Sequence, residues 1–139
     1  SSGDLISEDY FETYSLPYLK QLNDRLSEKC PYMLLHICGK TMERISALKD
    51  SGIAIFSVDS LDLEEALKRA EGKITIMGTL SPVRVLEQES PEEIYQKAQN
   101  LVQTAGLSGG FILAPGCDLT PDTSYEHIEA VVRAVSGKE

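Results

Sequence analysis

Residues 53–77 read IAIFSVDSLDLEEALKRAEGKITIM, and this stretch decides the fold. Two short apolar runs, Ile53–Val58 and Ile74–Met77, flank a segment with helical periodicity. The helical segment begins with the capping pattern Asp62–Glu65 and ends at Gly72. The connection between the two runs is long enough for a helical crossover, so the stretch predicts a parallel β-α-β unit.

The same alternation extends over the rest of the chain. Two further apolar runs, Tyr32–Ile37 and Gly110–Leu113, predict two more strands. An amphipathic segment, Glu8–Glu28, precedes the first strand and is expected to kink or divide at Pro17. The predicted helices that follow the strands begin at Thr41, Asp62, Ser90 and Thr123.

The predicted fold class is therefore α/β, a parallel βα repeat of four units after an amino-terminal helix. Eight such units make a TIM barrel of about 250 residues, so four units resemble half of a barrel. An open parallel sheet is the alternative. In both architectures, ligands bind at the carboxyl ends of the strands, in the loops that lead into the helices.

Apolar residues at helical spacing predict the buried faces of the first and last helices. The first segment carries Tyr10, Phe11, Tyr14, Tyr18, Leu19, Leu22 and Leu26. The last helix carries Ile128, Val131, Val132 and Val135.

Composition limits the classes of function. The chain has 139 residues, enough for one globular core, and is 42% hydrophobic. Its formal charge of −9 would repel nucleic acids and anionic membrane surfaces, so neither is expected as a partner. The longest apolar runs fall far short of the roughly 20 residues of a membrane helix.

Three cysteines, Cys30, Cys38 and Cys117, cannot form a closed disulfide framework, and the amino end has no charged-then-apolar signal peptide. We therefore expect a cytoplasmic protein with free thiols. The chain begins Ser1-Ser2-Gly3, without an initiator methionine, which suggests a fragment of a longer protein.

The loop after the first predicted strand carries two potential metal ligands. Because alternate residues of a strand share a face, His36 and Cys38 point the same way, about 6.5 to 7 Å apart along the chain. Cys117 follows the last predicted strand, so it lies at the same edge of the sheet, the carboxyl rim formed by the carboxyl ends of the strands. Three ligands with a fourth position open are typical of catalytic zinc. The alternative is a buried histidine and structural thiols.

Other rim residues have two interpretations each. Asp59 is a possible fourth ligand, or a carboxylate near a helix start. Lys40 and Arg84 could receive an anionic substrate, or be solvated surface residues. Asp118 and Asp122 follow Cys117, and Asp122 could help to cap the last helix.

Two further residues of types that bind metals are predicted to have structural roles and not to be ligands. Cys30 precedes Pro31 at the opposite, amino-terminal end of its strand, and His127 lies within the last amphipathic helix.

The donor set predicts the chemistry of such a zinc site. Two thiolates and a neutral imidazole leave the ion with a formal charge near zero, which makes it a weak Lewis acid toward water and a good partner for a soft ligand. A thiol that binds there would lose its proton. The site is therefore predicted to activate a thiol rather than to hydrolyse a substrate.

Three segments together resemble a known family: His36-Ile37-Cys38-Gly39, Gly78-Thr79-Leu80-Ser81-Pro82 and Gly110-Phe111-Ile112-Leu113-Ala114-Pro115-Gly116-Cys117-Asp118. The chain resembles the carboxyl-terminal half of the uroporphyrinogen decarboxylase superfamily, in its corrinoid-dependent branch, the methylcobamide:coenzyme M methyltransferases. Residues 1–139 would form one unit of such a barrel. Gly78-Thr79 departs from the Gly-Asn usual in the family, so the acceptor pocket could differ.

The resemblance implies a TIM barrel in which zinc on His36, Cys38 and Cys117 holds a thiolate. That thiolate takes a methyl group from a methylated corrinoid and leaves Co(I). The implied partners are a corrinoid protein, a small thiol such as coenzyme M, and either a missing amino-terminal half or a second copy of the chain, because a half barrel leaves strand edges unpaired.

Three alternatives stay open. The chain could belong to a uroporphyrinogen decarboxylase-like protein, which the resemblance implies would need no metal. It could be a non-catalytic module that binds a corrinoid protein. It could also transfer methyl from a folate donor, as the cobalamin-independent methionine synthases do.

Overall fold

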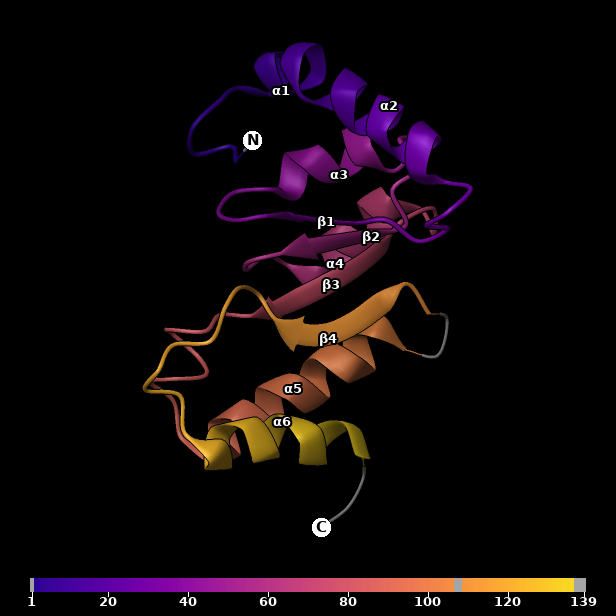
Figure 1. The fold of residues 1–139 in the computed structure, drawn as a ribbon. Coiled ribbons are helices and arrows are strands. Elements are labelled where there is room, and N and C mark those ends of the chain that lie inside the picture. The colour runs from indigo at the N-terminus through magenta and orange to yellow at the C-terminus, as the bar shows by residue number, and fades with distance from the viewer. Residues whose placement is uncertain (1, 107–108, 137–139) are drawn as a thin grey trace.

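Four parallel strands pair in the order β1-β2-β3-β4, so each strand lies beside its neighbours in the sequence (Figure 1). The computed structural model describes residues 2–106 and 109–136. The strands are β1 (Leu34–Ile37), β2 (Ile55–Val58), β3 (Thr75–Leu80) and β4 (Phe111–Pro115). The helices are α1 (Glu8–Tyr14), α2 (Leu16–Leu26), α3 (Met42–Leu48), α4 (Leu63–Ala70), α5 (Pro91–Ala105) and α6 (Tyr125–Ser136).

This architecture confirms the predicted α/β class, with four βα units after the amino-terminal helices and the form of half a TIM barrel. The predicted helix at residues 8–28 divides at Ser15, and Pro17 lies in the first turn of α2, where it costs no helical hydrogen bond. Figure 1 shows α1 and α2 beyond β1 at one end of the sheet, and α5 and α6 beyond β4 at the other.

The strand boundaries differ from the predicted ones. β1 and β2 begin two residues later than the apolar runs do, and β3 continues to Leu80. Ile53 and Ile74 are buried just before their strands begin. Hydrophobic burial, not strand pairing, explains why the apolar pattern begins before the strands.

One face of the sheet packs against helices and forms the core. Alternate residues of β2 and β3, Phe56, Val58 and Ile76, are fully buried there. The main cluster also includes Ile45 and Leu48 of α3. A smaller cluster joins Leu80, Leu86, Ile94 and Ala130 at the β4 side.

The other face of the sheet is the open one. Leu34 of β1 and Ile112 of β4 point to it and are 47% and 40% exposed. Ser57 lies between these strands on the same face, and it is 8% exposed. The polar residues considered below lie on this face and along its carboxyl rim.

Helix α5 begins with the predicted capping box. The Ser90 hydroxyl accepts a hydrogen bond from the Glu93 backbone, and the Glu93 carboxylate accepts one from the Ser90 backbone. Hydrogen bonds from the Ser90 hydroxyl and from the Ser90 backbone N–H to the Glu93 carboxylate hold the pKa of Glu93 below its ordinary value. Asp62 caps α4 by accepting a hydrogen bond from the backbone N–H of Glu65 at 2.9 Å.

Two predicted caps are wrong in detail. Thr41 occupies the N-cap position of α3, but its side chain makes no capping bond among the described residues. Thr123 contacts Thr120 instead of capping α6; the capping hydroxyl belongs to Ser124, which accepts from the His127 backbone at 3.3 Å. The true start is one residue later than predicted, because a second hydroxyl follows Thr123.

The terminal helices leave much of their predicted buried faces exposed. On α6, Val132 and Val135 are 58% and 59% exposed, and Ala130 is the buried residue. In α1 and α2, only Phe11 is buried, whereas Tyr10, Tyr14, Tyr18 and Leu22 are exposed. These helices lie at the two ends of the sheet, so each has packing partners on one side only.

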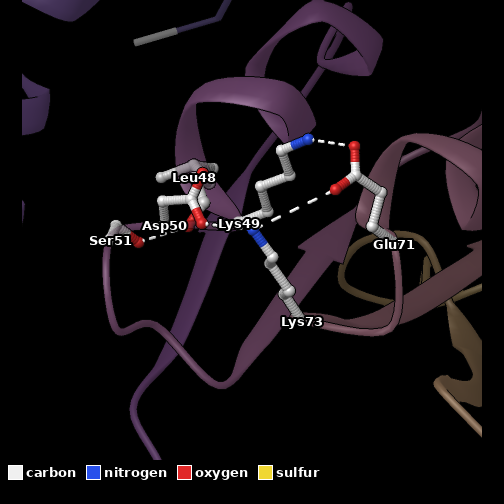
Figure 2. Close-up of polar contacts among 6 residues, drawn as sticks. All are labelled: Leu48, Lys49, Asp50, Ser51, Glu71 and Lys73. Atoms are coloured by element: carbon white, nitrogen blue, oxygen red, sulfur yellow. Dashed lines mark hydrogen bonds and ion pairs between the residues drawn. The ribbon is translucent and has the colours of Figure 1, made fainter.

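Ion pairs connect two loops at the amino ends of the strands (Figure 2). Lys73 binds Asp50 at 2.8 Å, and Lys49 binds Glu71. The lysines hold the pKa values of Asp50 and Glu71 below their ordinary values. The loops before β2 and β3 are thereby joined at the end of the sheet opposite the carboxyl rim.

No helix within the described residues is long and apolar enough to cross a membrane.

Ser90→Ala removes the hydroxyl that accepts from the Glu93 backbone and should lower the free energy of unfolding by about 1 kcal/mol, measured by urea denaturation. Ser15→Ala is the matched control, because Ser15 holds the N-cap position of α2 without a side-chain capping bond to any described residue. Equal losses for the two variants would contradict the assignment.

Candidate metal centre

His36, Cys38 and Cys117 come together at the carboxyl rim, with their ligand atoms all within 4.8 Å of one another. The His36 Nε2 lies 3.0 Å from the Cys38 Sγ, and the two sulfurs lie 3.6 Å apart. Both cysteines are free and exposed.

The approach of Cys38 to Cys117 is not explained by strand pairing alone. Two strands separate β1 from β4, and at about 4.8 Å per strand a flat sheet would hold their ends about 14 Å apart. The sulfurs meet because the loops after β1 and β4 reach toward each other over the open face. Such convergence is the geometry of a barrel mouth.

Gly116 allows the β4 loop to make this approach. A Cβ at this position would lie 1.9 Å from the backbone oxygen of Asp59, a distance that no side chain tolerates. The Gly116 N–H also donates to the Leu80 carbonyl at 2.8 Å. Backbone contacts with Asp59, just after β2, and with Leu80, the last residue of β3, therefore set the position of Cys117.

The segment before α1 holds the other loop. Asp4 accepts a hydrogen bond from the Lys40 backbone at 2.9 Å, which lowers the pKa of its carboxyl, and the Gly3 N–H donates to the Lys40 carbonyl at 2.8 Å. Gly39 has a φ of +76°, and a Cβ there would collide with the Asp4 carboxylate. These contacts fix the turn that immediately follows Cys38.

The separation of the two sulfurs is close to that in a tetrahedral zinc site. Bonds of about 2.3 Å from zinc to sulfur place two ligand sulfurs about 3.8 Å apart. The observed separation of the Cys38 and Cys117 sulfurs is 3.6 Å. A nitrogen and two sulfurs are donors that zinc accepts, so these residues could hold such an ion.

The cluster opens into a shallow pocket of about 440 Å³. Its lining residues are His36, Cys38, Ser57, Met77, Ala114, Pro115, Cys117 and Asp118. Met77, Ala114 and Pro115 make part of the lining apolar, and both cysteines are exposed, so a small ligand could reach the cluster from solvent.

Without a metal, the environment favours the neutral thiol of Cys38. The hydrogen bond with Cys117 raises the pKa of the Cys38 thiol first, and burial and the charges of Asp59 and Asp118 raise it further. A cation at this position would reverse the balance, because it favours the thiolate.

Within the described part of the chain, the group of three potential ligand residues does not include Asp59, although the charge of Asp59 contributes to the raised pKa of Cys38. Its role as a fourth ligand stays a prediction. Asp118 lines the pocket. Asp122 lies exposed in the turn before α6, whose cap is Ser124.

The remaining candidates have structural surroundings. His127 bonds to the Leu86 carbonyl through Nδ1 at 2.8 Å, which connects α6 to the segment after β3. Cys30 lies before β1, at the other end of the strand from the cluster. Lys40 pairs with Asp4 at 3.5 Å, and Arg84 is exposed after β3.

Sequence reasoning missed two features of the centre. Ser57, whose Oγ lies 3.0 Å from the His36 Nδ1, could have been found: His36 and Ser57 are each the penultimate residue of an apolar run, and aligned strand ends make them neighbours. The contact of Asp4 with the loop after Cys38 had no signal in the sequence, because it joins residues 36 positions apart.

Comparison with protein families gives a match over nearly the whole chain. A family profile described as "Uroporphyrinogen decarboxylase (URO-D)" matches residues 1–137. Among curated proteins, the "Methylcobamide:CoM methyltransferase MtbA" of Methanosarcina acetivorans is 31% identical over 133 residues. The "Uroporphyrinogen decarboxylase" of Synechococcus sp. (strain JA-3-3Ab) is 35% identical over 140 residues.

Each of these two alignments includes 95% of this chain but only 38% and 36% of the relatives, respectively. A solved structure titled "methyltransferase from Methanosarcina mazei" superposes with a TM-score of 0.83 at 25% identity, over 96% of this chain and 38% of that one. The chain thus spans well under half the length of the proteins it matches.

Gly116→Ala should separate Cys117 from Cys38, because the new methyl group collides with the Asp59 backbone. Mild oxidation with diamide, followed by mass spectrometry of peptides, should give a Cys38–Cys117 disulfide in the parent chain and much less in the variant. Gly72→Ala is the control: Gly72 has a φ of +69°, so the variant carries backbone strain of its own, but nothing lies within 4 Å of its Cβ. Cross-linking of Gly116→Ala at the parent yield would overturn this account of Cys117.

Proposed function

The chain belongs to the uroporphyrinogen decarboxylase (URO-D) family, and from this premise we propose that it carries the thiol-activating centre of a zinc-dependent methyltransferase. The reaction transfers a methyl group from a methylated corrinoid to a small thiol such as coenzyme M. The observation that carries the proposal is the convergence of His36, Cys38 and Cys117 within 4.8 Å.

The family contains both methyltransferases and decarboxylases, and the percentage of residues that this chain shares with each does not decide between the two activities. The donor set favours the methyltransferases. Decarboxylation in this family, as the resemblance implies, needs no metal. It would therefore give the His36 nitrogen and the two cysteine sulfurs no role in the reaction. A thiol-activating zinc site uses all three.

Zinc bound by these residues would lower the pKa of an incoming thiol, so that it binds as a thiolate at neutral pH. The thiolates of Cys38 and Cys117 would cancel the charge of the ion, so the sulfur of the bound substrate would stay nucleophilic. His36 contributes a neutral donor, held by Ser57 at its other nitrogen.

The reaction balances as a nucleophilic displacement. The thiolate sulfur forms a bond to the methyl carbon, and the cobalt–carbon bond breaks with its electron pair left on cobalt. Methyl-Co(III) thereby becomes Co(I), the thiol becomes a thioether, and the thiol proton passes to solvent. No other oxidant or reductant is needed.

The open face supports access by a large methyl donor. His36 and Cys38 line the pocket shared with Cys117, and they also line a groove of about 540 Å³ that extends toward α2. A corrinoid carried on a partner protein would approach this exposed rim. Because the chain spans 38% of the matched methyltransferase, the rest of the substrate pocket is expected on the part of the enzyme outside this chain.

Cys117→Ser should abolish stoichiometric zinc binding, because a hydroxyl is a poor ligand and two protein donors remain. We expect the parent chain, loaded with zinc and desalted, to retain about one ion per chain by elemental analysis. Cys30→Ser is the matched control, since Cys30 lies away from the cluster, and it should retain the parent zinc content. Retention of zinc by Cys117→Ser would show that the ligand set is wrong.

The zinc-loaded chain should accelerate demethylation of methylcobalamin by coenzyme M, seen as loss of the cobalt–carbon chromophore. Cys117→Ser should lose this acceleration and Cys30→Ser should keep it. Zinc binding without any acceleration would support the passive corrinoid-protein-binding module instead. Equal acceleration with and without zinc would contradict the proposed chemistry.

Zinc affinity should rise with pH. The pKa of the Cys38 thiol is raised in the metal-free protein, so the thiol is protonated at neutral pH and must release its proton to bind. The apparent affinity should therefore increase by at least about tenfold per pH unit between about pH 6.5 and 8, measured by chelator competition. Cys30→Ser, which keeps all three ligand residues, should show the parent slope; a parent affinity independent of pH would contradict the assignment.

A further inference from the structure

The side chain of His36 has a defined contact at each ring nitrogen. Its Nε2 faces the Cys38 sulfur at 3.0 Å, and its Nδ1 faces the Ser57 hydroxyl oxygen at 3.0 Å. A neutral imidazole carries one proton, so one nitrogen donates and the other accepts. Which nitrogen holds the proton decides whether His36 can serve as a ligand.

Strand pairing places Ser57 beside His36. The two residues are register partners in the parallel pair β1–β2, so their side chains lie on the same face of the sheet. Ser57 is in turn the register partner of Met77 of β3. The hydroxyl therefore has His36 on one side and an apolar side chain on the other.

Burial increases the importance of this contact. Ser57 is 8% exposed, although the histidine beside it is open to the pocket. Leaving a buried hydroxyl without a hydrogen-bond partner is unfavourable, so the bond to the imidazole is favoured. Among the bonds described for Ser57, the one to His36 is its side-chain contact.

We propose that Ser57 is the positioning residue of the cluster: its hydroxyl accepts a hydrogen bond from the Nδ1–H of His36 and thereby directs the Nε2 lone pair toward Cys38 and Cys117. Ser57 does not contact the metal or the substrate in this account. It selects the tautomer and fixes the ring orientation in which His36 can bind an ion.

The choice of a hydroxyl has a chemical consequence. A carboxylate in this position would make the imidazole more basic and would add a negative charge beside two thiolates. Serine orients the ring and adds no charge. The formal charge of a zinc centre on these residues then stays near zero, which suits thiol activation. This consequence rests on the function proposed above, whereas the tautomer does not.

The first experiment examines the metal-free chain. Long-range nitrogen–proton NMR correlations of the His36 ring, assigned with His36→Gln, should show the Nδ1–H tautomer as the major neutral form. Ser57→Ala should shift the population toward Nε2–H, and Ser57→Thr, which keeps the hydroxyl, should restore it. A parent chain in which Nε2–H is the major form would overturn the proposal, and this measurement needs no variant of Ser57 to fold.

The second experiment measures Zn²⁺ affinity by chelator competition. Ser57→Ala should weaken binding by about 10- to 100-fold, the range found when such supporting contacts are removed, and Ser57→Thr should recover most of it. Parent-like affinity of Ser57→Ala would overturn the positioning role. A parent chain that binds no Zn²⁺ but holds the Nδ1–H tautomer would refute the proposed function and leave the role of Ser57 in orienting His36 intact.

Discussion

In-register parallel pairing aligns the carboxyl ends of β1, β2, β3 and β4 on one rim, and every functional feature of the chain depends on that alignment. It sets His36 beside Ser57 and leaves the loops after β1 and β4 to converge over the open face. Antiparallel pairing would send alternate loops to opposite ends of the sheet. Cys38 and Cys117 could then not meet.

Two backbone contacts convert this shared rim into a defined centre. Gly116 rests against the Asp59 carbonyl, and Asp4 binds the backbone next to Gly39. Each contact fixes the loop that carries one cysteine, and on the shared rim these two contacts bring the sulfurs to 3.6 Å from each other. Two thiolates and an imidazole would nearly cancel the charge of a zinc ion, which favours the proposed thiol chemistry over hydrolysis.

The sequence predicts the order and type of the elements well, because apolar runs, the Ser90 capping box and Gly72 are local signals. It also identifies the three residues of the cluster by strand alternation and a shared rim. The sequence does not predict features that depend on contacts between distant parts of the chain. Val132 and Val135 have the spacing of a buried face but lack a neighbour that covers them, and the Asp4 contact depends on the path of a segment with no periodicity. Thr123 and Ser124 offer adjacent hydroxyls, and packing decides which one caps α6.

The central claim is that His36, Cys38 and Cys117 together hold one zinc ion that can accept a thiol. X-ray absorption at the zinc edge of the loaded chain tests it most directly. We expect an inner shell of two sulfurs at about 2.3 Å with nitrogen or oxygen neighbours, and one additional sulfur when coenzyme M is added. A shell of nitrogen and oxygen alone, or one unchanged by the thiol, would contradict it.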